Sequence, residues 1–502
     1  MNKRILALIL AGIILCSSAA CSGGTENAAE DTETTADTVA ADAQAETETE
    51  KPDNMTPTEA RQLISDELPE KSFDGSTFTV AVESSKTFEI VSEELTGEAT
   101  SDSVYDRNIR IEDRFDVKIE ALETSSPQDN LKTVVTAGAS AYQVAGFWNY
   151  VSYVPIMAKV VYNWCDIPYI NLDQPWYNKV SNDAATINGK LYAINGDLSI
   201  TTLLYTYGMF FNYSIMDRYG YTGDDLYNMV FDGTWTVDNM HSITTNIYED
   251  TNGDGMHDRD DVHGYSVFLG LNTSDVWLAA FDLDVIDVHD DGTFEITFLN
   301  EKTVSALEKA IALTYDANGT YCNTTDWRDV PRAFGEGKIA MTQLYFGETT
   351  ESLSEMEDKY GILPLPKFDE AQTNYYTNAW DQFSVYAIPK TITAEEKELL
   401  GVIFEVLNAE SYKTVYPAYY DQALKSRYSA EATTAEIIDI IMEGRKLEFA
   451  FQFGEQTAQL PYKFRQLLQQ NKTDLASTFK TIEKTATKTF QKVLDVYYSD
   501  DE

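Results

Sequence analysis

A loop between residues 250 and 261 concentrates oxygen-bearing side chains in the sequence DTNGDGMHDRDD. Acids and amides recur at alternate positions before Gly255, as in the D-x-[DN]-x-[DN]-G calcium loop, in which the glycine permits a sharp turn. Calcium prefers oxygen ligands, which side chains and one backbone carbonyl would supply here. The expected ligands are Asp250, Asn252, Asp254, Met256 through its carbonyl, Asp258 and Asp261. The loop therefore predicts a bound calcium ion.

Two positions of this loop differ from the commonest calcium loop. Asp261 closes the loop where Glu is usual, and the shorter side chain predicts weaker binding. His257 stands where a hydrophobic residue is usual, and the sequence has no second copy of the pattern with which the loop could pair. A structural ion is therefore favoured over a switch, and a solvated loop that merely tolerates acids is the alternative.

The sequence offers no familiar pattern for covalent chemistry. It contains no G-x-G-x-x-G, P-loop, G-x-S-x-G or H-E-x-x-H, and its four histidines lack metal-ligand spacing. Asp and Glu number 82, so a glycosidase-like pair of carboxylates can be chosen almost anywhere and carries no information. The formal net charge of -45 disfavours nucleic acid as a partner, because phosphate backbones reward clustered Lys and Arg.

The N-terminus indicates export. Lys3 and Arg4 precede the apolar run ILALILAGIIL, which is too short to span a bilayer and is followed by small residues. Residues 1–20 are therefore expected to be a signal peptide.

Cys21 resembles the lipidated cysteine of a bacterial lipobox, although Ser18 replaces the usual leucine. Residues 21–57 are rich in Thr, Ala, Asp and Glu and cannot bury enough apolar surface to offset their ordering entropy. They are expected to form a disordered acidic linker, which favours lipidation of Cys21 over simple secretion. The expected location is the extracellular face of the cytoplasmic membrane.

Roughly 430 residues remain beyond the linker, more than one hydrophobic core usually supports, so two lobes are expected. Residues 78–83 and 142–147 have strand-like patterns, and residues 104–115 between them have a helical one. This alternation is typical of βαβ units and predicts an α/β fold. The expected division is 72–195 for the first lobe, 196–325 for the second lobe with the calcium loop, 326–383 for a return to the first lobe, and 384–502 for a helical part that completes both.

Several residues are expected to be structural. A helical stripe of apolar residues from Leu475 to Tyr497 predicts core packing, as do Trp164 and Trp235. Thr393 followed by Glu396 predicts a capping box. Cys165 and Cys322 could form a disulfide or remain two buried free thiols, and the sequence leaves both possibilities open.

Three segments resemble the bacterial extracellular solute-binding proteins (family 1) that deliver sugars to ABC importers. They are FGEGKIAMTQLYFG, YGILPLPKFDE and SVYAIPKTITAEEKELLGVIFEVL. The family's F-x-x-G-K-x-A-M turn matches Phe334, Gly337, Lys338, Ala340 and Met341, and its P-L-P strand end matches Pro364, Leu365 and Pro366. Further segments, including SVYDRNIRIEDRFDVKI, are similar to a clostridial-type lipoprotein subgroup. The resemblance implies a two-lobed periplasmic-binding-protein-like fold (type II), with hinged lobes around a central cleft.

This resemblance implies binding without chemistry, and hence no enzyme. The expected function is capture of an extracellular oligosaccharide by a monomeric lipoprotein that delivers it to the permease subunits of an ABC importer. A peptide or cationic solute is the alternative, suggested by the acidic body, and a surface glycan-degrading enzyme is the less favoured one.

Sugars are held by aromatic faces and by polar groups around the rim, and in open α/β sheets ligands lie at the carboxyl ends of strands. The candidates follow such ends in the expected strands or adjoin them. The expected ligand-binding residues are Trp148, Asn149, Tyr150, Trp176, Tyr177, Asp197, Tyr345, Phe346, Trp380 and Asp381.

Overall fold

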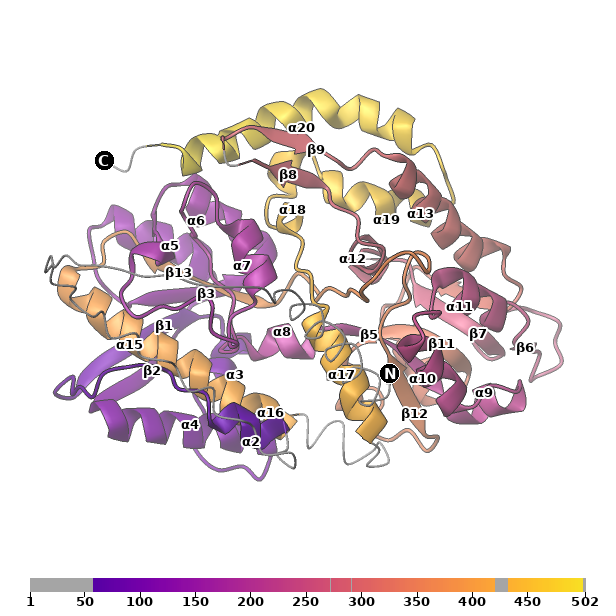
Figure 1. Cartoon of the computed structure of the whole chain (residues 1–502), viewed down its shortest axis with the longest axis horizontal. Helices are drawn as coiled ribbons and strands as arrows, with labels where there is room; N and C mark the ends of the chain where they lie inside the picture. Colours follow the sequence, from indigo (N-terminus) through magenta and orange to yellow (C-terminus); the bar gives the residue numbers. More distant parts are fainter. Residues whose placement is uncertain (1–56, 271, 290, 420–431, 500–502) are drawn as a thin grey trace, which may run out of the picture. The chain divides into compact units, whose positions relative to one another are not determined.

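A computed structural model describes residues 57–270, 272–289, 291–419 and 432–499 (Figure 1). The unit Thr56–Glu502 is described below. The expected signal peptide, Cys21 and almost all of the acidic linker lie outside the described residues. Among the described residues, no helix is both long and apolar enough to cross a membrane.

The first lobe is built on a five-stranded sheet with the order β2-β1-β3-β13-β4. Its strands are β1 (Ser76–Val82), β2 (Val117–Glu123), β3 (Val144–Trp148), β4 (Val161–Tyr162) and β13 (Ser384–Pro389). Its connecting helices include α4 (Ala99–Phe115), α5 (Pro127–Thr136), α6 (Tyr153–Met157) and α7 (Lys179–Ala185). Strand β1 runs parallel to β2 and β3, whereas β13 runs antiparallel to β3. The βαβ rhythm expected from the sequence is thus present, and the α/β fold class is confirmed.

The second lobe is built on a six-stranded sheet with the order β10-β7-β11-β5-β12, and β6 pairs with β7. Its strands are β5 (Tyr207–Asn212), β6 (Tyr248–Glu249), β7 (Val262–Phe268), β10 (Thr320–Asn323), β11 (Ile339–Tyr345) and β12 (Tyr360–Leu363). Its helices include α9 (Tyr213–Arg218), α10 (Gly223–Phe231), α11 (Val237–Thr244), α12 (Val276–Ala280), α13 (Glu301–Ile311) and α14 (Asp329–Gly335). A separate hairpin joins β8 (Ile286–Val288) to β9 (Phe294–Ile296).

The expected return of residues 326–383 to the first lobe is wrong. Strand β11 pairs antiparallel with β5 from Met341 opposite Phe211 to Tyr345 opposite Tyr207, and β12 pairs with the other side of β5. Both strands therefore belong to the second sheet, and the chain rejoins the first sheet only at β13. Strand periodicity shows that a segment is a strand, but sequence order alone does not show which sheet takes it.

Several of the described segments connect the lobes. The first contains α8 (Ile200–Leu204), and the second is 364–383. A further one includes α15 (Ala394–Glu410), α16 (Tyr416–Tyr419) and α17 (Ala432–Glu443), of which α17 contacts β12 (Figure 1). Gly196 lets the first segment approach α15, because a Cβ there would lie 2.3 Å from Asn408 Oδ1. That oxygen instead accepts a hydrogen bond of 2.9 Å from the Leu198 amide.

The C-terminal helices complete the molecule as the apolar stripe predicted. They are α18 (Phe449–Gln452), α19 (Lys463–Gln469) and α20 (Leu475–Tyr497). The stripe of α20 is buried, as are Trp164 and Trp235, so these three predictions are confirmed. The Thr393–Glu396 capping box is also present, at the start of α15.

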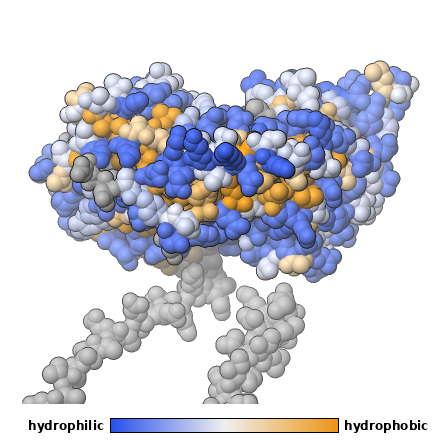
Figure 2. Space-filling model, turned by 90° about the horizontal axis from the view of Figure 1, so that it is seen from above, coloured by the Kyte–Doolittle hydropathy of each residue, from blue (hydrophilic) through white to orange (hydrophobic). Residues whose placement is uncertain are grey.

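The surface seen in Figure 2 is mainly hydrophilic, with hydrophobic patches between polar side chains.

Cys165 and Cys322 are both free, which decides against the disulfide alternative. Cys322 is half-buried but Cys165 is exposed, so the expectation of two buried thiols is wrong for Cys165. Cys165 lies in a short turn after β4, and its neighbour Trp164 fills the core instead.

Candidate ligand-binding site

An aromatic cluster lies where β5 begins and β11 ends. The Tyr345 ring centroid is 5.6 Å from that of Tyr205, 5.8 Å from that of Trp380 and 6.1 Å from that of Tyr207. The rings of Tyr205 and Trp380 are 5.1 Å apart. Edge-to-face and tilted pairs at such spacings suit the aromatic quadrupole, so the cluster supports itself without a ligand.

Backbone hydrogen bonds fix the segments that carry these rings. The Trp380 amide donates to the Tyr205 carbonyl at 2.9 Å, and the Phe346 amide donates to the Thr206 carbonyl at 3.0 Å. The start of β5, the end of β11 and segment 364–383 are thereby tied together. Rings on a rigid frame lose little entropy when a ligand contacts them, which favours binding.

A cavity of about 160 Å³ opens beside this cluster. Its lining consists of Tyr207, Phe268, Thr273, Trp327, Val330, Pro331, Gln343, Leu344, Tyr345, Glu348 and Trp380. The wall is thus largely aromatic and apolar with few polar groups, the composition typical of small-molecule sites. Gln343 is already held, since its Oε1 accepts from the Tyr265 hydroxyl at 2.7 Å and its Nε2 donates to the Thr273 carbonyl at 3.3 Å.

The first lobe contributes a second aromatic pair, at the end of β3. The rings of Trp148 and Tyr150 are 5.5 Å apart and both side chains are half-buried. The Tyr150 amide donates to the Asp381 carbonyl at 3.3 Å, next to Trp380 in the chain. The structure therefore brings the predicted residues Trp148 and Tyr150 close to the segment that carries Trp380.

Lys86 links the same two regions. Its Nζ donates to the Gln382 carbonyl at 2.8 Å and lies 5.2 Å from the centroid of the Tyr205 ring. Burial lowers the pKa of Lys86, and the charges of Glu89 and Glu83 oppose that shift. A buried cation beside an aromatic ring adds a polar, positively charged group to this side of the cluster.

Asn149 and Asp381 line a different and smaller cavity, of about 20 Å³. Burial raises the pKa of Asp381 to about 6, and the positive charge of Arg465 opposes the shift. Arg465 is itself paired with the buried Asp275 at 2.7 Å. Trp380 and Asp381 therefore face different cavities, and only Trp380 joins the aromatic cluster.

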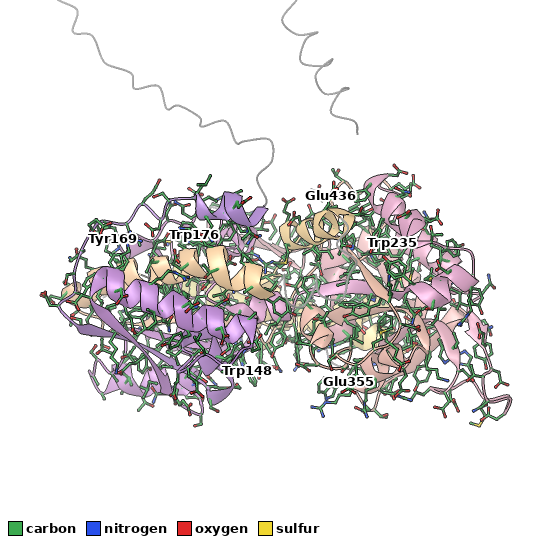
Figure 3. The ribbon with its side chains drawn as sticks, turned by 90° about the horizontal axis from the view of Figure 1, so that it is seen from below. Trp148, Tyr169, Trp176, Trp235, Glu355 and Glu436 are labelled. Atoms are coloured by element: carbon green, nitrogen blue, oxygen red, sulfur yellow. The ribbon has the colours of Figure 1, made fainter. Side chains whose placement is uncertain are left out.

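The prediction that Trp176 and Tyr177 bind ligand is wrong, because both are core residues. The Trp176 Nε1 donates to Glu405 Oε1 at 3.0 Å, and the Tyr177 hydroxyl donates to Glu405 Oε2 at 2.6 Å. In Figure 3 Trp176 is labelled beside α15, the helix that carries Glu405, whereas Trp148 is labelled away from that helix. The QPWYN sequence therefore anchors the first lobe to α15.

Two further predicted residues also fall outside the cluster. Phe346 is fully buried, and one of its ring carbons faces Gly208 of β5. Asp197 is buried in the first connecting segment, where burial raises its pKa to about 7 while Arg445 and Arg61 oppose the shift. Neither residue lines the cavity beside Trp380, so both predictions are corrected to structural roles.

The sequence did not single out Lys86, Tyr205, Tyr207 or Glu348. Both tyrosines lie at the junction of a connecting segment with β5, which carries no recognisable motif among 31 tyrosines. Glu348 follows Tyr345 by three residues, and proximity to a strand end was the signal that could have identified it. Acids are too abundant in this chain for that signal to stand out.

In the loop at 250–261, Gly253 and Gly255 have positive φ, and the calcium pattern uses a glycine at the second of these positions for its sharp turn. The amides of these two glycines donate to the two oxygens of Asp250 at 2.7 and 3.0 Å, which orients that carboxylate into the loop. Asp261 is buried and accepts from the Tyr248 hydroxyl at 3.0 Å. Burial alone would raise the pKa of Asp261, but hydrogen bonds from Tyr248 and from backbone amides lower it below its usual value.

His257 packs as an aromatic residue in this loop. Its ring stacks on Tyr248 at 4.7 Å, and its Nε2 lies 2.9 Å from the Asn318 carbonyl. A ring contact therefore takes the place of the hydrophobic residue that is usual at this position. Within the described residues, no three His, Cys, Asp or Glu side chains are gathered as a metal-ligand group. The donor types and the turn fit calcium, and the ion itself stays a prediction.

Solved structures of substrate-binding proteins share this fold. An ABC substrate-binding protein from Listeria monocytogenes in complex with cycloalternan has a TM-score of 0.50 and 15% identity, covering 83% of this chain and 99% of that one. A solute-binding protein from Thermotoga lettingae bound with α-D-tagatose has a TM-score of 0.51 and 14% identity, covering 84% and 100%. The GacH receptor of Streptomyces glaucescens, solved unliganded and with acarbose, has a TM-score of 0.50 and 14% identity, covering 84% and 99%.

No family model matches the chain, and no curated protein matches it. At such low identity the structural similarity shows the fold alone. The chain therefore has the two-lobed α/β fold of these substrate-binding proteins, as the three sequence segments implied.

Proposed function

We propose that this chain is the substrate-binding component of an ABC importer and captures an extracellular carbohydrate without cleaving it. The observation that carries the proposal is the aromatic cavity at the end of β11, lined by Tyr207, Tyr345, Trp327 and Trp380. Flat aromatic faces with a few fixed polar groups suit the C–H surfaces and hydroxyls of a sugar. Proteins with this fold have been solved with cycloalternan, tagatose and acarbose, which supports a sugar ligand here.

Delivery to permease subunits and attachment to the membrane belong to the same proposal. The signal-like N-terminus, Cys21 and the acidic linker support a protein tethered by lipid to the extracellular face of the cytoplasmic membrane, and a monomer is part of the proposal. Membership of the clostridial-type lipoprotein subgroup rests on the sequence segments alone. Labelling of cells with a clickable fatty acid would report acylation, and loss of the label in Cys21→Ser is the expected result.

Isothermal titration of the purified chain against a panel of linear and cyclic oligosaccharides tests carbohydrate capture. We expect saturable binding of at least one glycan that Trp380→Ala weakens and Phe231→Ala leaves unchanged. Phe231 is a suitable control because it is an exposed aromatic residue that does not line the cavity. Binding of peptides but of no glycan would replace the sugar by the alternative ligand class, and release of new reducing ends would make the protein an enzyme.

A peptide or cationic solute stays the second candidate because of buried acids near the aromatic cluster. Asp275, Asp381 and Glu448 line the small cavity described above. Burial raises the pKa of Glu448 to about 7, and Lys446 opposes the shift. These carboxylates already have Arg465 and Lys446 as neighbouring cations, so a neutral sugar is favoured over a cationic solute for that region.

We also propose that the loop at 250–261 holds a structural calcium ion. The residues that would hold it are Asp250, Asn252, Asp254, Met256 through its carbonyl, Asp258 and Asp261. The bound ion would neutralise acids and restrict the loop, and extracellular calcium at about millimolar concentration fills even a weak site.

A further inference from the structure

Glu348 is a buried carboxylate in the wall of the aromatic cavity. It lies in the short helical turn η7 (Phe346–Thr349) directly after β11, and it is 1% exposed. Neither of its carboxylate oxygens meets a donor in hydrogen-bonding geometry within the described residues. Most buried polar atoms in folded proteins are hydrogen-bonded, so an acid with two unpaired oxygens that lines a cavity indicates a missing partner.

The surroundings of Glu348 do not balance its charge. The residues that line the cavity include no Lys, Arg or His. The Tyr345 hydroxyl lies within reach of the carboxylate, but the contact lacks hydrogen-bonding geometry. Burial and the charges of Glu348 and Glu351 raise the pKa of Tyr345, so its phenol stays neutral and does not balance the charge. Arg328 lies 4.6 Å from the Trp327 ring centroid with its side chain exposed, and it does not line the cavity. The cavity therefore combines aromatic walls with an uncompensated negative charge.

We propose that this cavity takes a protonated amine carried by the sugar, so that the ligand is an amino sugar or contains one. This inference rests on the proposed carbohydrate function and narrows it to one chemical class. An ammonium group would form charge-assisted hydrogen bonds with Glu348 and lie against the faces of Trp327 and Trp380. The cavity of about 160 Å³ is close in size to one of about 150 Å³ that admits a benzene ring, so it takes a single sugar ring.

Neutral hydroxyls are the competing partners for the carboxylate. A hydroxyl can donate to either a carboxylate or a carboxamide oxygen. Glu348→Gln should therefore reduce the affinity for a neutral sugar only slightly. An ammonium group pairs with the charge itself, and the same substitution then removes the main attraction. The comparison of Glu with Gln at this position therefore separates the two ligand classes.

The experiment is isothermal titration with glucosamine oligosaccharides and with N-acetylglucosamine oligosaccharides of the same length. The two series share a sugar backbone. The first carries a protonated amine where the second carries a neutral acetamide. We expect the natural chain to bind the free-amine series about 10-fold tighter or more, and Glu348→Gln to lose about 10- to 100-fold for that series only. Glu355→Gln is the matched control, because Glu355 is exposed and does not line the cavity. Figure 3 labels Glu355.

Unfolding of the ligand-free variants gives a second readout. Removing an unpaired buried charge relieves a desolvation cost, so Glu348→Gln and Glu348→Met should unfold at a higher temperature than the natural chain. Equal affinity for both glycan series, or an effect of Glu348→Gln on both alike, would overturn the amine inference while leaving carbohydrate capture intact. If no glycan of either series or of the wider panel bound, the proposed function itself would fail.

Discussion

Glu405 and Glu348 are both buried glutamates, but they have opposite surroundings. Glu405 accepts hydrogen bonds from Trp176 Nε1, the Tyr177 hydroxyl and the Asn171 amide. Glu348 accepts none of acceptable geometry from the described residues and lines a cavity. A buried acid with all its hydrogen bonds holds neighbouring segments together. A buried acid without them indicates a partner that the folded chain does not itself supply.

The same contrast separates two tryptophans that looked alike in the sequence. Trp176 is fully buried with its indole N–H bound to Glu405. Trp380 is half-buried and presents its ring to the cavity. A tryptophan in a connecting segment thus belongs either to the core or to the wall of a cavity, and its polar partners decide which.

Glu405→Ala should have the largest effect on stability, together with Trp176→Ala. It removes the acceptor of two buried donors and leaves a cavity, so we expect the free energy of unfolding to fall by about 3–5 kcal/mol. Urea denaturation measures this loss. Glu355→Ala, at an exposed site, is the control and should change stability by less than about 0.5 kcal/mol. A similarly small loss in Glu405→Ala would remove its structural role.

The pH dependence of stability sharpens the same point. Burial raises the pKa of Glu405 to about 7 from the ordinary 4.5. A group whose pKa is raised in the folded state contributes its full stabilisation at a pH below its pKa in the unfolded state. This contribution is lost as the pH rises through its pKa in the folded state. We therefore expect the free energy of unfolding to fall between about pH 5 and pH 8, by up to about 3 kcal/mol from this group.

Glu405→Gln should make that pH profile less steep by the share of this one group, because the amide does not titrate. The remaining slope would come from other buried acids, including Asp197 and Glu448, whose pKa values burial raises to about 7, and Asp381, whose pKa burial raises to about 6. Urea denaturation across the pH range, compared between the natural chain and Glu405→Gln, gives the difference. A stability that rises with pH over this range would contradict the assignment.

Trp380→Ala should mainly reduce binding, whereas Trp176→Ala should mainly reduce stability. We expect Trp380→Ala to weaken glycan binding about 10- to 100-fold, because a cavity wall is lost, and to lower stability less than Trp176→Ala, because Trp380 is only half-buried. Trp176→Ala should lower the free energy of unfolding by about 3–5 kcal/mol and leave the affinity of the folded fraction unchanged. Titration calorimetry and urea denaturation on both variants measure the two effects. If Trp176→Ala reduced affinity and Trp380→Ala did not, the roles assigned here would be exchanged.

Calcium removal should give the smallest effect. Chelation should lower the unfolding temperature by about 1–3 °C, because an ion that binds only the folded loop adds modest stability. Adding back calcium should restore it, whereas sodium at equal ionic strength should not. Asp254→Ala should abolish the difference, and Asp260→Ala, an exposed residue of the same loop outside the expected ligand set, should retain it. Identical melting curves with and without chelator would leave the loop without an ion.

Local structure was predictable where the residues of a single segment determine it. The apolar stripe of α20, the Thr393–Glu396 capping box and the βαβ start of the first lobe follow from periodicity and local hydrogen bonding, and all are present. Sheet membership was not predictable in this way, because β11 and β12 join the second sheet through contacts distant in sequence.

The site was predictable only in part for a related reason. Trp148, Tyr150, Tyr345 and Trp380 lie at or near the aromatic cluster, as expected from their places beside strand ends. Trp176 has a similar sequence environment, but a glutamate more than two hundred residues later in the chain holds it in the core. Glu348 is unpaired because none of the elements around it places a hydrogen-bond donor in good geometry. A local sequence pattern cannot predict this, because it depends on segments distant in the chain.

A crystal structure of the chain with its tightest-binding glycan tests the central claim most directly. We predict an intact sugar whose ring lies against Trp380 and Tyr345 at the end of β11. A glycan bound away from these rings, or one recovered cleaved, would contradict the claim that this cavity captures a carbohydrate unchanged.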